Sequence, residues 1–408
     1  VSDLEIESVV LDIIKNIRER GDEALIDYTL SFDKFKLHKD NIRVSSIEIE
    51  DALKKTDRDI IDALSLAADR IRNYHVRQKE ESWQFEEDGI TLGMLIRPME
   101  RIGVYVPGGK AAYPSSVLMN VIPAQVAGVG EIALCVPAPK GELNQYVLAA
   151  AGLIGVKEIY RVGGAQAVGA MAYGTESIKK VDKIVGPGNI YVATAKRLVY
   201  GVVDIDMIAG PSEILIIADD KAKKEFLAAD MLSQAEHDSM ASSILVTPSR
   251  RLAEDVEREV YKMMERLPRR TFISSSIEEW GAIIITKDLR EAVDVANRIA
   301  PEHLEIMTED PKSLLPFIKH AGAVFLGEWT PEPIGDYIAG PNHTLPTART
   351  SRFFSPLGVY DFLKRTSLIA LNEKGFRRLA PFVSILSDIE GLKAHGNTIK
   401  TRLDSIST

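Results

Sequence analysis

The segment Ser233-Gln234-Ala235-Glu236-His237-Asp238 places an amide and an imidazole three residues apart. It follows apolar residues at helical spacing, which predicts a helix from about residue 222 to 238. On such a helix Gln234 and His237 lie beside the same face, so both side chains can reach one metal ion. A lone histidine at a helix end more often caps the last carbonyls, and this segment alone favours that role.

Two further histidines have neighbours suited to proton transfer or binding. His303 follows Glu302 in Ala-Pro-Glu-His-Leu at 300 to 304, where proline forces a turn directly before a predicted strand. Glu302 and His303 would then point in different directions from one loop and supply two distinct proton carriers. His343 shares the stretch 335–347 with Asp336, and glycines and prolines break this stretch too often for a regular element. Long irregular loops are often functional.

The last histidine, His395, follows Glu390 by five residues near the end of the chain. One carboxylate, one amide and several imidazoles suit a mixed nitrogen and oxygen zinc site with room for a substrate. None of these residues has the compact spacing of a zinc finger or of an H-E-x-x-H helix. Each histidine taken alone therefore favours a surface or capping role, which we assign to His38, His75 and His320.

Two glycine-containing segments bear on nucleotide binding. The segment 128–133 fits G-x-G-x-x-A, but it follows a predicted helix and precedes a predicted strand. The phosphate-binding fingerprint needs the order strand, glycines, helix, so that the helix N-terminus faces the pyrophosphate, and we reject this match. The segment 186–191, Gly-Pro-Gly-Asn-Ile-Tyr, has the right order but carries Tyr191 where the third glycine belongs. A dinucleotide at this turn would bind in a non-standard way.

The single cysteine, Cys135, lies inside the apolar stretch Ala-Leu-Cys-Val at 133 to 136. Burial in a strand raises the pKa of a thiol and blocks access to it, so we expect an inert core residue. An aldehyde oxidation by this protein would then use activated water rather than a thioester. One cysteine also excludes an internal disulfide framework and fits a reducing compartment.

Alternating strands and helices position these candidate residues. Such βαβ repetition predicts the α/β class, with two doubly wound, Rossmann-like lobes built on parallel sheets. The strand ends in the first of the two blocks are rich in glycine and proline, and ligands of open α/β sheets bind at the carboxyl ends of strands. The expected strands are 90–96, then 102–106, 132–136, 158–162, 183–185 and 202–206, then 213–218, 243–246, 282–286, 304–307 and 323–326.

The pattern outside these blocks is helical up to about residue 81 and again at about 373–378. We therefore divide the chain into three parts. Residues 1–101 and 213–355 form one α/β lobe with the N-terminal helices, 102–212 form the second lobe, and 356–408 form a small C-terminal module.

Composition narrows the class of protein. The chain has 408 residues, 45% of them hydrophobic and 27% charged, as in ordinary globular proteins. A formal net charge of −9 argues against nucleic acid as the main partner, since phosphate binding needs a basic face. No stretch approaches the roughly 18 apolar residues of a membrane span, and the N-terminal stretch lacks the features of a signal or transit peptide. We expect a soluble, cytoplasmic protein with no nucleic-acid or membrane partner.

Several of these stretches together resemble the histidinol dehydrogenases, over most of the chain from about Arg97 onward. The motifs occur in the right order, which makes the resemblance highly specific. They are residues 102–109, 163–167, 186–189, 209–213, 233–238, 300–304 and 340–347, with the tail that holds Glu390 and His395.

The resemblance implies oxidation of L-histidinol to L-histidine through histidinal, with two NAD consumed and one zinc per site. It also implies a homodimer in which the C-terminal module is exchanged and completes the partner's site. By position, the zinc ligands are Gln234, His237, Asp336 and, from the other subunit, His395, and the catalytic pair is Glu302 and His303. The same zinc ligands and His303 contact the substrate together with Ser212, His343 and, from the other subunit, Glu390, while NAD contacts Tyr105, Gln166 and Asn189.

Two other classes of protein remain open at this point. A zinc hydrolase would use Glu302 as general base without NAD, and formation of reduced nicotinamide on adding histidinol would distinguish it. A two-lobed solute-binding protein would hold a ligand between its lobes, but the polar cluster of candidate residues argues against it. Because the cofactor turn lacks a glycine fingerprint, we also expect weak, exchangeable NAD binding.

Overall fold

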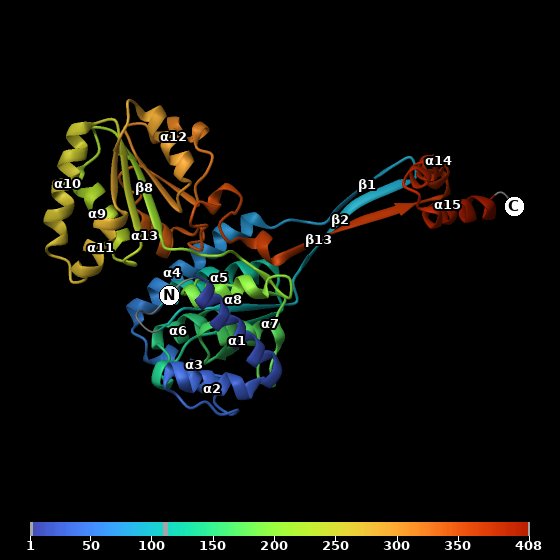
Figure 1. The fold of residues 1–408 in the computed structure, drawn as a ribbon, viewed down its shortest axis with the longest axis horizontal. Coiled ribbons are helices and arrows are strands. Elements are labelled where there is room, and N and C mark those ends of the chain that lie inside the picture. The colour runs from blue at the N-terminus through green and yellow to red at the C-terminus, as the bar shows by residue number, and fades with distance from the viewer. Residues whose placement is uncertain (1–2, 109–112, 407–408) are drawn as a thin grey trace. The chain divides into compact units, whose positions relative to one another are not determined.

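The computed structural model describes residues 3–108 and 113–406. These residues form two compact units (Figure 1). The first comprises the chain up to Gln78 together with Met99–Phe362, and the second comprises Lys79–Pro98 and the chain from Leu363 onward. Both main sheets lie in the first unit, and the fold is α/β as expected.

One parallel sheet of the first unit has the strand order β5-β4-β3-β6-β7. Strands β3 and β6 are neighbours although two strands separate them in sequence, so the strand order reverses there and a crevice opens at their carboxyl ends. The strands are β3 (Arg101–Tyr105), β4 (Glu131–Cys135), β5 (Glu158–Tyr160), β6 (Lys183–Val185) and β7 (Asp204–Ile205), and the helices between them are α5 (Pro114–Ala127), α6 (Gln145–Leu153), α7 (Gly164–Tyr173) and α8 (Ile190–Val199).

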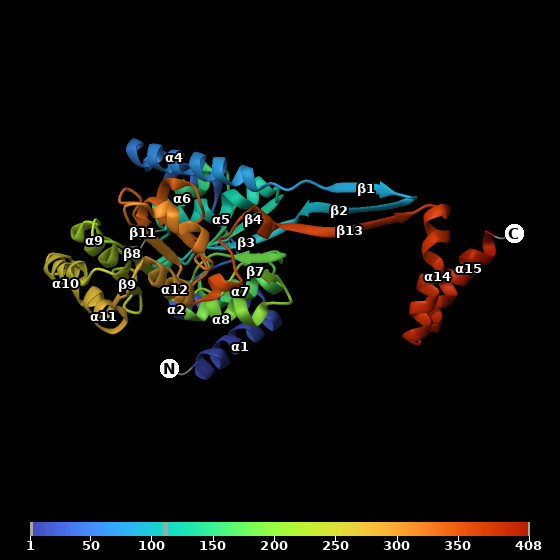
Figure 2. The same cartoon turned by 90° about the horizontal axis from the view of Figure 1, so that it is seen from above.

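The second parallel sheet repeats the same pattern, with the order β10-β9-β8-β11-β12. Alternate side chains of β8 enter two separate cores: Ile214 and Ile216 pack with α9 and α10, and Leu215 and Ile217 pack with α12. The helices accordingly cover both faces of the sheet (Figures 1 and 2). The strands are β8 (Glu213–Ala218), β9 (Ser242–Thr247), β10 (Ala282–Ile285), β11 (His303–Met307) and β12 (Ala323–Leu326), and the helices are α9 (Lys224–Ala235), α10 (Arg250–Met264), α11 (Arg270–Trp280), α12 (Leu289–Ile299) and the short α13 (Glu332–Ile334).

The N-terminal helices pack on the helices that cover the sheet of β3–β7, and α4 also contacts the turn η4 (Gly335–Ala339) that follows β12. Helix α1 packs against α7 and α8, α3 packs against α6, and α4 packs against α5. The expected grouping of residues 1–101 with 213–355 differs from these contacts, because an amphipathic pattern shows which helix face is buried but not what covers it. These helices are α1 (Asp3–Arg20), α2 (Asp22–Asp33), α3 (Ser46–Lys55) and α4 (Arg58–His75).

The second unit is a three-stranded antiparallel sheet, β1-β2-β13, followed by two helices. Asp88 and Gly89 both have positive φ, as the tight hairpin between β1 and β2 requires. The expected C-terminal module began at residue 356, whereas Leu357, Val359 and Phe362 are buried in the first unit. The elements are β1 (Trp83–Glu87), β2 (Ile90–Pro98), β13 (Leu363–Leu371), α14 (Glu373–Ile389) and α15 (Lys393–Ser405).

None of the described helices is long and apolar enough to cross a membrane.

Candidate functional site

Glu302 and His303 are both anchored to the backbone of one residue, Glu213, at the start of β8. The Glu213 N–H donates to Glu302 Oε2 at 2.9 Å, and His303 Nδ1 donates to the Glu213 carbonyl at 3.0 Å. The parallel register of β8 and β11 brings these strand starts together. Both side chains are buried, with 6% of Glu302 and 2% of His303 exposed. The two expected proton carriers are therefore held in fixed orientations at the amino ends of the strands.

The turn before β11 is tightly constrained. Helix α12 ends at Ile299, and the next residue, Ala300, has φ of +55°, a strained conformation for a residue with a Cβ atom. In the adjacent segment, directly before β12, a Cβ atom at Gly322 would lie 2.5 Å from the Glu302 carbonyl oxygen. Only glycine fits there without movement, so the backbone around Glu302 is fixed from two sides.

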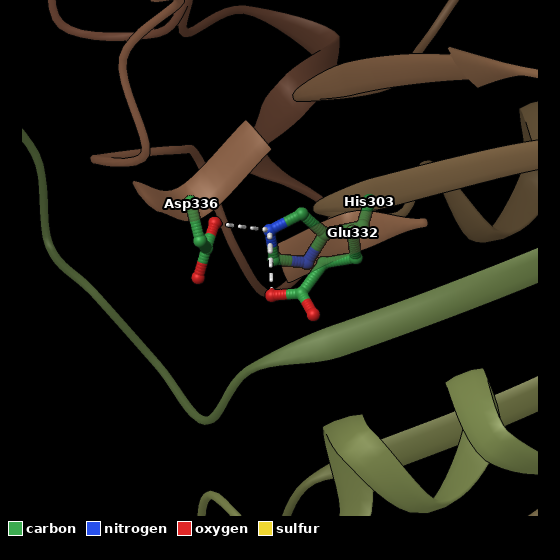
Figure 3. A group of neighbouring side chains, drawn as sticks. All are labelled: His303, Glu332 and Asp336. Atoms are coloured by element: carbon green, nitrogen blue, oxygen red, sulfur yellow. Dashed lines mark ion pairs between the residues drawn. The ribbon is translucent and has the colours of Figure 1, made fainter. Parts of the chain in front are cut away.

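The second ring nitrogen of His303, Nε2, lies near two carboxylates. Nε2 lies 3.6 Å from Asp336 Oδ1 and 3.9 Å from Glu332 Oε1, and the three ligand atoms lie within 4.8 Å of one another. Figure 3 shows both carboxylates directed at the same nitrogen. Glu332 begins α13 and Asp336 lies in the π-helical turn η4 (Gly335–Ala339), four residues later and on the same helical face. This group has the composition of a cation site.

The charges in the cluster set the protonation of the catalytic candidates. Burial alone would lower the pKa of His303, but the negative charges of Glu302 and Asp336 outweigh it and raise the pKa to about 10. Burial raises the pKa of Glu302 to about 7, against the opposing effect of the nearby imidazolium. Glu302 therefore changes its protonation state near neutral pH, as a general base must.

Asp336 and Glu332 differ in charge although they are neighbours. Burial opposes ionisation of Asp336, but the attraction of the protonated His303 ring, 3.6 Å away, prevails and lowers its pKa. Burial and the charge of Asp336 raise the pKa of Glu332. One carboxylate is thus ionised while the other keeps its proton.

His343 contacts the same turn as a neutral ring. Its Nδ1 donates to the Asp336 carbonyl at 2.9 Å, which leaves Nε2 as the acceptor for the Ser116 hydroxyl at 3.4 Å. Burial lowers the pKa of His343, in keeping with a neutral tautomer. Asp336 and His343 also line a cavity of about 460 Å³, which Phe325 and Tyr74 border.

Two more acids, Asp230 and Glu305, are buried next to this cluster, and neither was predicted from the sequence. Glu305 follows His303 by two residues on β11 and accepts the Glu332 N–H at 2.8 Å. Asp230, on α9, interacts electrostatically with Glu305, and its negative charge helps to keep the Glu305 carboxyl protonated by raising its pKa. Burial raises the pKa of both groups. Glu305 thereby ties β11 to the turn that carries Glu332.

Helix α9 is shorter than expected, ending at Ala235 instead of about residue 238. Gln234 is fully buried, and neither polar atom of its amide has a hydrogen-bond partner among the described residues. His237 lies just past the helix end, where its surroundings lower its pKa through loss of water and Asp336 acts in the opposite direction. His237 is exposed, and the charges of Asp336 and His303 reach it. An exposed ring beside a buried cluster is free to bind a ligand.

The donor set around Asp336 fits a zinc ion. A buried amide with two unpaired polar atoms is unfavourable unless a ligand satisfies it, and Gln234 is such a group. An ionised carboxylate and a neutral imidazole, Asp336 and His237, are the oxygen and nitrogen donors that zinc accepts. His303 Nε2 is also buried without a hydrogen-bond partner.

The remaining expected substrate and metal contacts lie in different parts of the chain. Ser212 is partly buried directly before β8, and its carbonyl accepts the Ser242 N–H at 3.0 Å. Glu390 and His395 belong to the second compact unit, where both side chains are exposed at the junction of α14 and α15.

The expected NAD contacts lie at the carboxyl edge of the sheet of β3–β7. Tyr105 ends β3, and its hydroxyl accepts the Gly164 N–H at 3.1 Å. Gln166, in the first turn of α7, is buried with an unpaired amide oxygen, and Asn189 caps α8 through its side chain. Gly109, in the expected motif after β3, lies outside the described residues.

Several residues set aside on sequence grounds have the expected surroundings. Cys135 is fully buried, and burial raises the pKa of its thiol to about 12, which confirms the inert-core prediction. The segment at Gly128 does connect a helix to a strand, α5 to β4. His75 is an exception, since it is buried in the core and its Nδ1 donates to the Ile71 carbonyl at 2.8 Å.

Two Rossmann-like lobes that carry a buried histidine among carboxylates define an α/β enzyme equipped for proton transfer. The family model for histidinol dehydrogenase matches residues 1–403. The histidinol dehydrogenase of Aquifex aeolicus is 55% identical over 398 residues, covering 98% of this chain and 92% of that protein. The enzyme of Geobacter sulfurreducens is 54% identical over 403 residues, covering 98% and 94%.

A solved structure gives the same result. The crystal structure of histidinol dehydrogenase from Elizabethkingia anophelis superposes with a TM-score of 0.95 at 40% identity, covering 100% of this chain and 94% of that one. The chain therefore belongs to the histidinol dehydrogenase family, and it is an oxidoreductase. These matches do not support the zinc hydrolase or the solute-binding protein.

Proposed function

We propose that the protein oxidises L-histidinol to L-histidine through histidinal, in the last steps of histidine biosynthesis, using NAD and a bound zinc ion. The observation that carries this proposal is the fixed pair Glu302 and His303, one group titrating near neutral pH and the other facing a cation-binding carboxylate. Family membership supplies the substrate. The pair supplies the bases for the three proton transfers in a two-step oxidation of an alcohol to an acid.

His303 and Glu302 take separate roles. In the first step His303 Nε2 removes the hydroxyl proton of histidinol as the hydride leaves carbon. His303 then releases this proton to solvent. In the second step Glu302 removes a proton from water while the water oxygen attacks histidinal, and the neutral His303 takes the remaining hydroxyl proton as the second hydride leaves. His303 acts as a base once a cation balances Asp336, since that carboxylate helps to raise its pKa.

Four residues would hold the zinc ion: Gln234, His237, Asp336 and His395 of the partner subunit. When bound, NAD accepts the hydride in each step and zinc holds the amine and imidazole of the substrate near it. Ser212, His343 and Glu390 of the partner subunit would complete the substrate contacts. Gln234 supports this set, because its buried amide has no other partner among the described residues.

The exposed apolar side chains of the second unit support a homodimer. Helix α14 exposes a row of large hydrophobic residues, including Phe382 at 63% and Ile389 at 77% exposure. All five residues of β1 are also exposed. A small three-stranded sheet needs an apolar face covered to be stable, and a second copy of the chain would cover this one. The same exchange would deliver His395 to the partner's site.

NAD would bind at the carboxyl edge of β3 and β6, in contact with Tyr105, Gln166 and Asn189. The turn after β6 is Gly-Pro-Gly-Asn and its helix is capped by Asn189, which occupies two of the N–H groups that a pyrophosphate would otherwise use. We therefore expect weak and exchangeable NAD binding, and tight co-purification of NAD would count against it. Two NAD molecules must visit one site in succession, which loose binding permits.

The decisive experiment combines metal analysis with a histidinol assay. The wild-type protein should contain one zinc per chain and should form two NADH per histidinol. His395→Asn should lose zinc and activity together, whereas His38→Asn, at an exposed histidine far from these residues in sequence, should keep both. Wild-type zinc content and activity in His395→Asn would refute the shared site, and absence of NADH formation by the wild type would refute the reaction.

A further inference from the structure

The turn between β6 and α8 is held by a buried ion pair that is not part of any site described above. Lys196, on α8, and Asp206, just after β7, form this pair, with 3% and 1% of their side chains exposed. Neither residue lies near the Glu302 cluster in the fold, since both belong to the lobe of β3–β7. A buried lysine and aspartate are costly to desolvate, so their placement calls for a local reason.

Both backbone groups of Gly186 are bound by this pair. The Gly186 N–H donates to Asp206 Oδ2 at 2.7 Å, and Lys196 Nζ donates to the Gly186 carbonyl at 2.9 Å. Asp206 also accepts the N–H of Met207 at 2.6 Å, which fixes the carboxylate itself. Gly186 directly follows β6, where no strand supplies hydrogen bonds to its backbone. The side chains of Asp206 and Lys196 satisfy its N–H and its carbonyl instead.

There is no room for a side chain at Gly186. Its φ is +113°, and a Cβ atom there would lie 2.0 Å from the Tyr105 carbonyl oxygen, so the turn is pressed against the end of β3. Two residues later, a Cβ atom at Gly188 would lie 2.4 Å from the side chain of Val192. The backbone of 186–189 is thus packed between the end of β3 and the start of α8.

We propose that Lys196 and Asp206 are positioning residues for the dinucleotide, holding the 186–189 turn at the height that lets NAD reach the crevice between β3 and β6. This inference rests on the proposed cofactor edge. In a standard fingerprint the glycine spacing alone determines the conformation of the turn. Here the buried side chains of Lys196 and Asp206 also bind the carbonyl and the N–H of Gly186. The pair touches neither substrate nor cofactor and acts only through Gly186.

Strand β6, which precedes this turn, contains a matched control for Lys196. Lys183, the first residue of β6, is also a buried lysine, with 5% of its side chain exposed. It binds Asp204 Oδ2 at 3.0 Å and donates to the Asp361 carbonyl at 2.8 Å. It lies at the amino end of β6, opposite the cofactor edge. Substitution at either position removes a buried lysine, but Lys183 pairs with Asp204, whose side chain is 42% exposed, whereas Lys196 pairs with the buried Asp206 and holds the turn.

The test compares full-length Lys196→Met, Lys183→Met and Asn189→Ala with wild type. NAD affinity is measured by titration calorimetry, and KM is measured separately for NAD and histidinol. We expect Lys196→Met to weaken NAD binding about tenfold, the loss of one charge-assisted hydrogen bond, with KM for histidinol unchanged. Lys183→Met should leave NAD affinity unchanged. If Lys196→Met does not fold, the double variant Lys196→Met/Asp206→Asn removes both buried charges and keeps an acceptor for the Gly186 N–H.

Three outcomes overturn the inference in distinguishable ways. If Asn189→Ala weakens NAD binding and the Lys196 variants do not, the cofactor edge stands and the positioning role falls. If Lys183→Met and Lys196→Met weaken NAD binding equally, the effect is general loss of stability. If none of the variants changes NAD binding, the cofactor does not bind at this edge, and the proposed cofactor site falls together with the inference.

Discussion

The hydrogen bond from the Glu213 N–H fixes the position of the Glu302 carboxyl group, and burial brings its pKa close to neutral pH. Because burial raises the pKa of Glu302 to about 7, the fraction of carboxylate rises as the pH increases through that value. We expect the rate of histidinal oxidation to rise with pH between about 6 and 8. Glu302→Gln should lower this rate by about 10²- to 10⁴-fold, the usual contribution of a general base.

The measurement is the pH profile of NADH formation from histidinal, in wild type and Glu302→Gln. Oxidation of histidinol to histidinal should fall much less, because that step needs no water. Glu309→Gln, at an exposed glutamate, serves as control. An unchanged pH profile in Glu302→Gln would show that another group activates the water.

The site residues that lie in recognisable motifs could be predicted from the sequence, whereas those marked only by their burial in the fold could not. Glu302, His303 and Asp336 stood out through their neighbours. Glu332 was missed, although its spacing of four residues before Asp336 would have placed both on one face had that segment been expected to be helical. Glu305 could not have been found, since a carboxylate in a predicted strand gives no sign that it will be buried.

At the scale of elements, Glu305 links β11 to α13. Its side chain is the acceptor for the Glu332 N–H, so losing it should loosen the turn that presents Asp336. We expect Glu305→Leu to lower both zinc content and kcat, the latter about tenfold, while Glu305→Gln retains the acceptor and stays close to wild type. Metal analysis and steady-state kinetics check this, and equal losses in both variants would exclude a positioning role.

The sheets were predictable because their strands are short apolar runs bounded by turns. The expected strands at 183–185, 213–218 and 323–326 match β6, β8 and β12 residue for residue. Strand β13 was missed because its residues lack the alternation of a half-buried strand, and β1 was missed because its alternating residues make up only five positions, all of them exposed. Helix α15 was missed for a similar reason, as it has no buried residue to set a period.

The whole molecule should respond to pH through its buried acids. The pKa values of Glu302, Glu305 and Glu332 are raised in the folded chain, so the folded chain keeps protons that the unfolded chain releases above pH 4.5. His303 acts in the same direction above 6.5, because its folded pKa is also raised. Below about pH 6.5 His75, His237 and His343, whose pKa values are lowered, act in the opposite direction. Unfolding therefore releases protons above that pH, and the stability of the metal-free protein should fall as pH rises from about 7 to 9.

Denaturant unfolding of the metal-free protein at several pH values measures this slope. Glu305→Gln, which cannot ionise, should flatten it, and Glu309→Gln should not. Stability that increased across this range would contradict the assignment of protons to the buried acids.

A shared site has a direct test in mixed dimers. His395→Asn and Glu302→Gln are each expected to lose nearly all oxidation of histidinal, which is the activity to be measured. In a mixed dimer, one site receives an intact Glu302 from one subunit and an intact His395 from the other. Co-refolding equal amounts should therefore restore about a quarter of wild-type activity, since half the dimers are mixed and each has one good site. No recovery would mean that each site is built from one chain.

The burial of Cys135 has a practical consequence for such experiments. The chain contains no other cysteine, and this thiol is both inaccessible and poorly ionised. Any cysteine introduced at an exposed position, such as Lys400→Cys on α15, would be the one reactive thiol of the protein. Fluorescent or spin labels can thus be attached at single chosen points without first removing native cysteines, and subunit exchange can be followed by energy transfer between labelled chains.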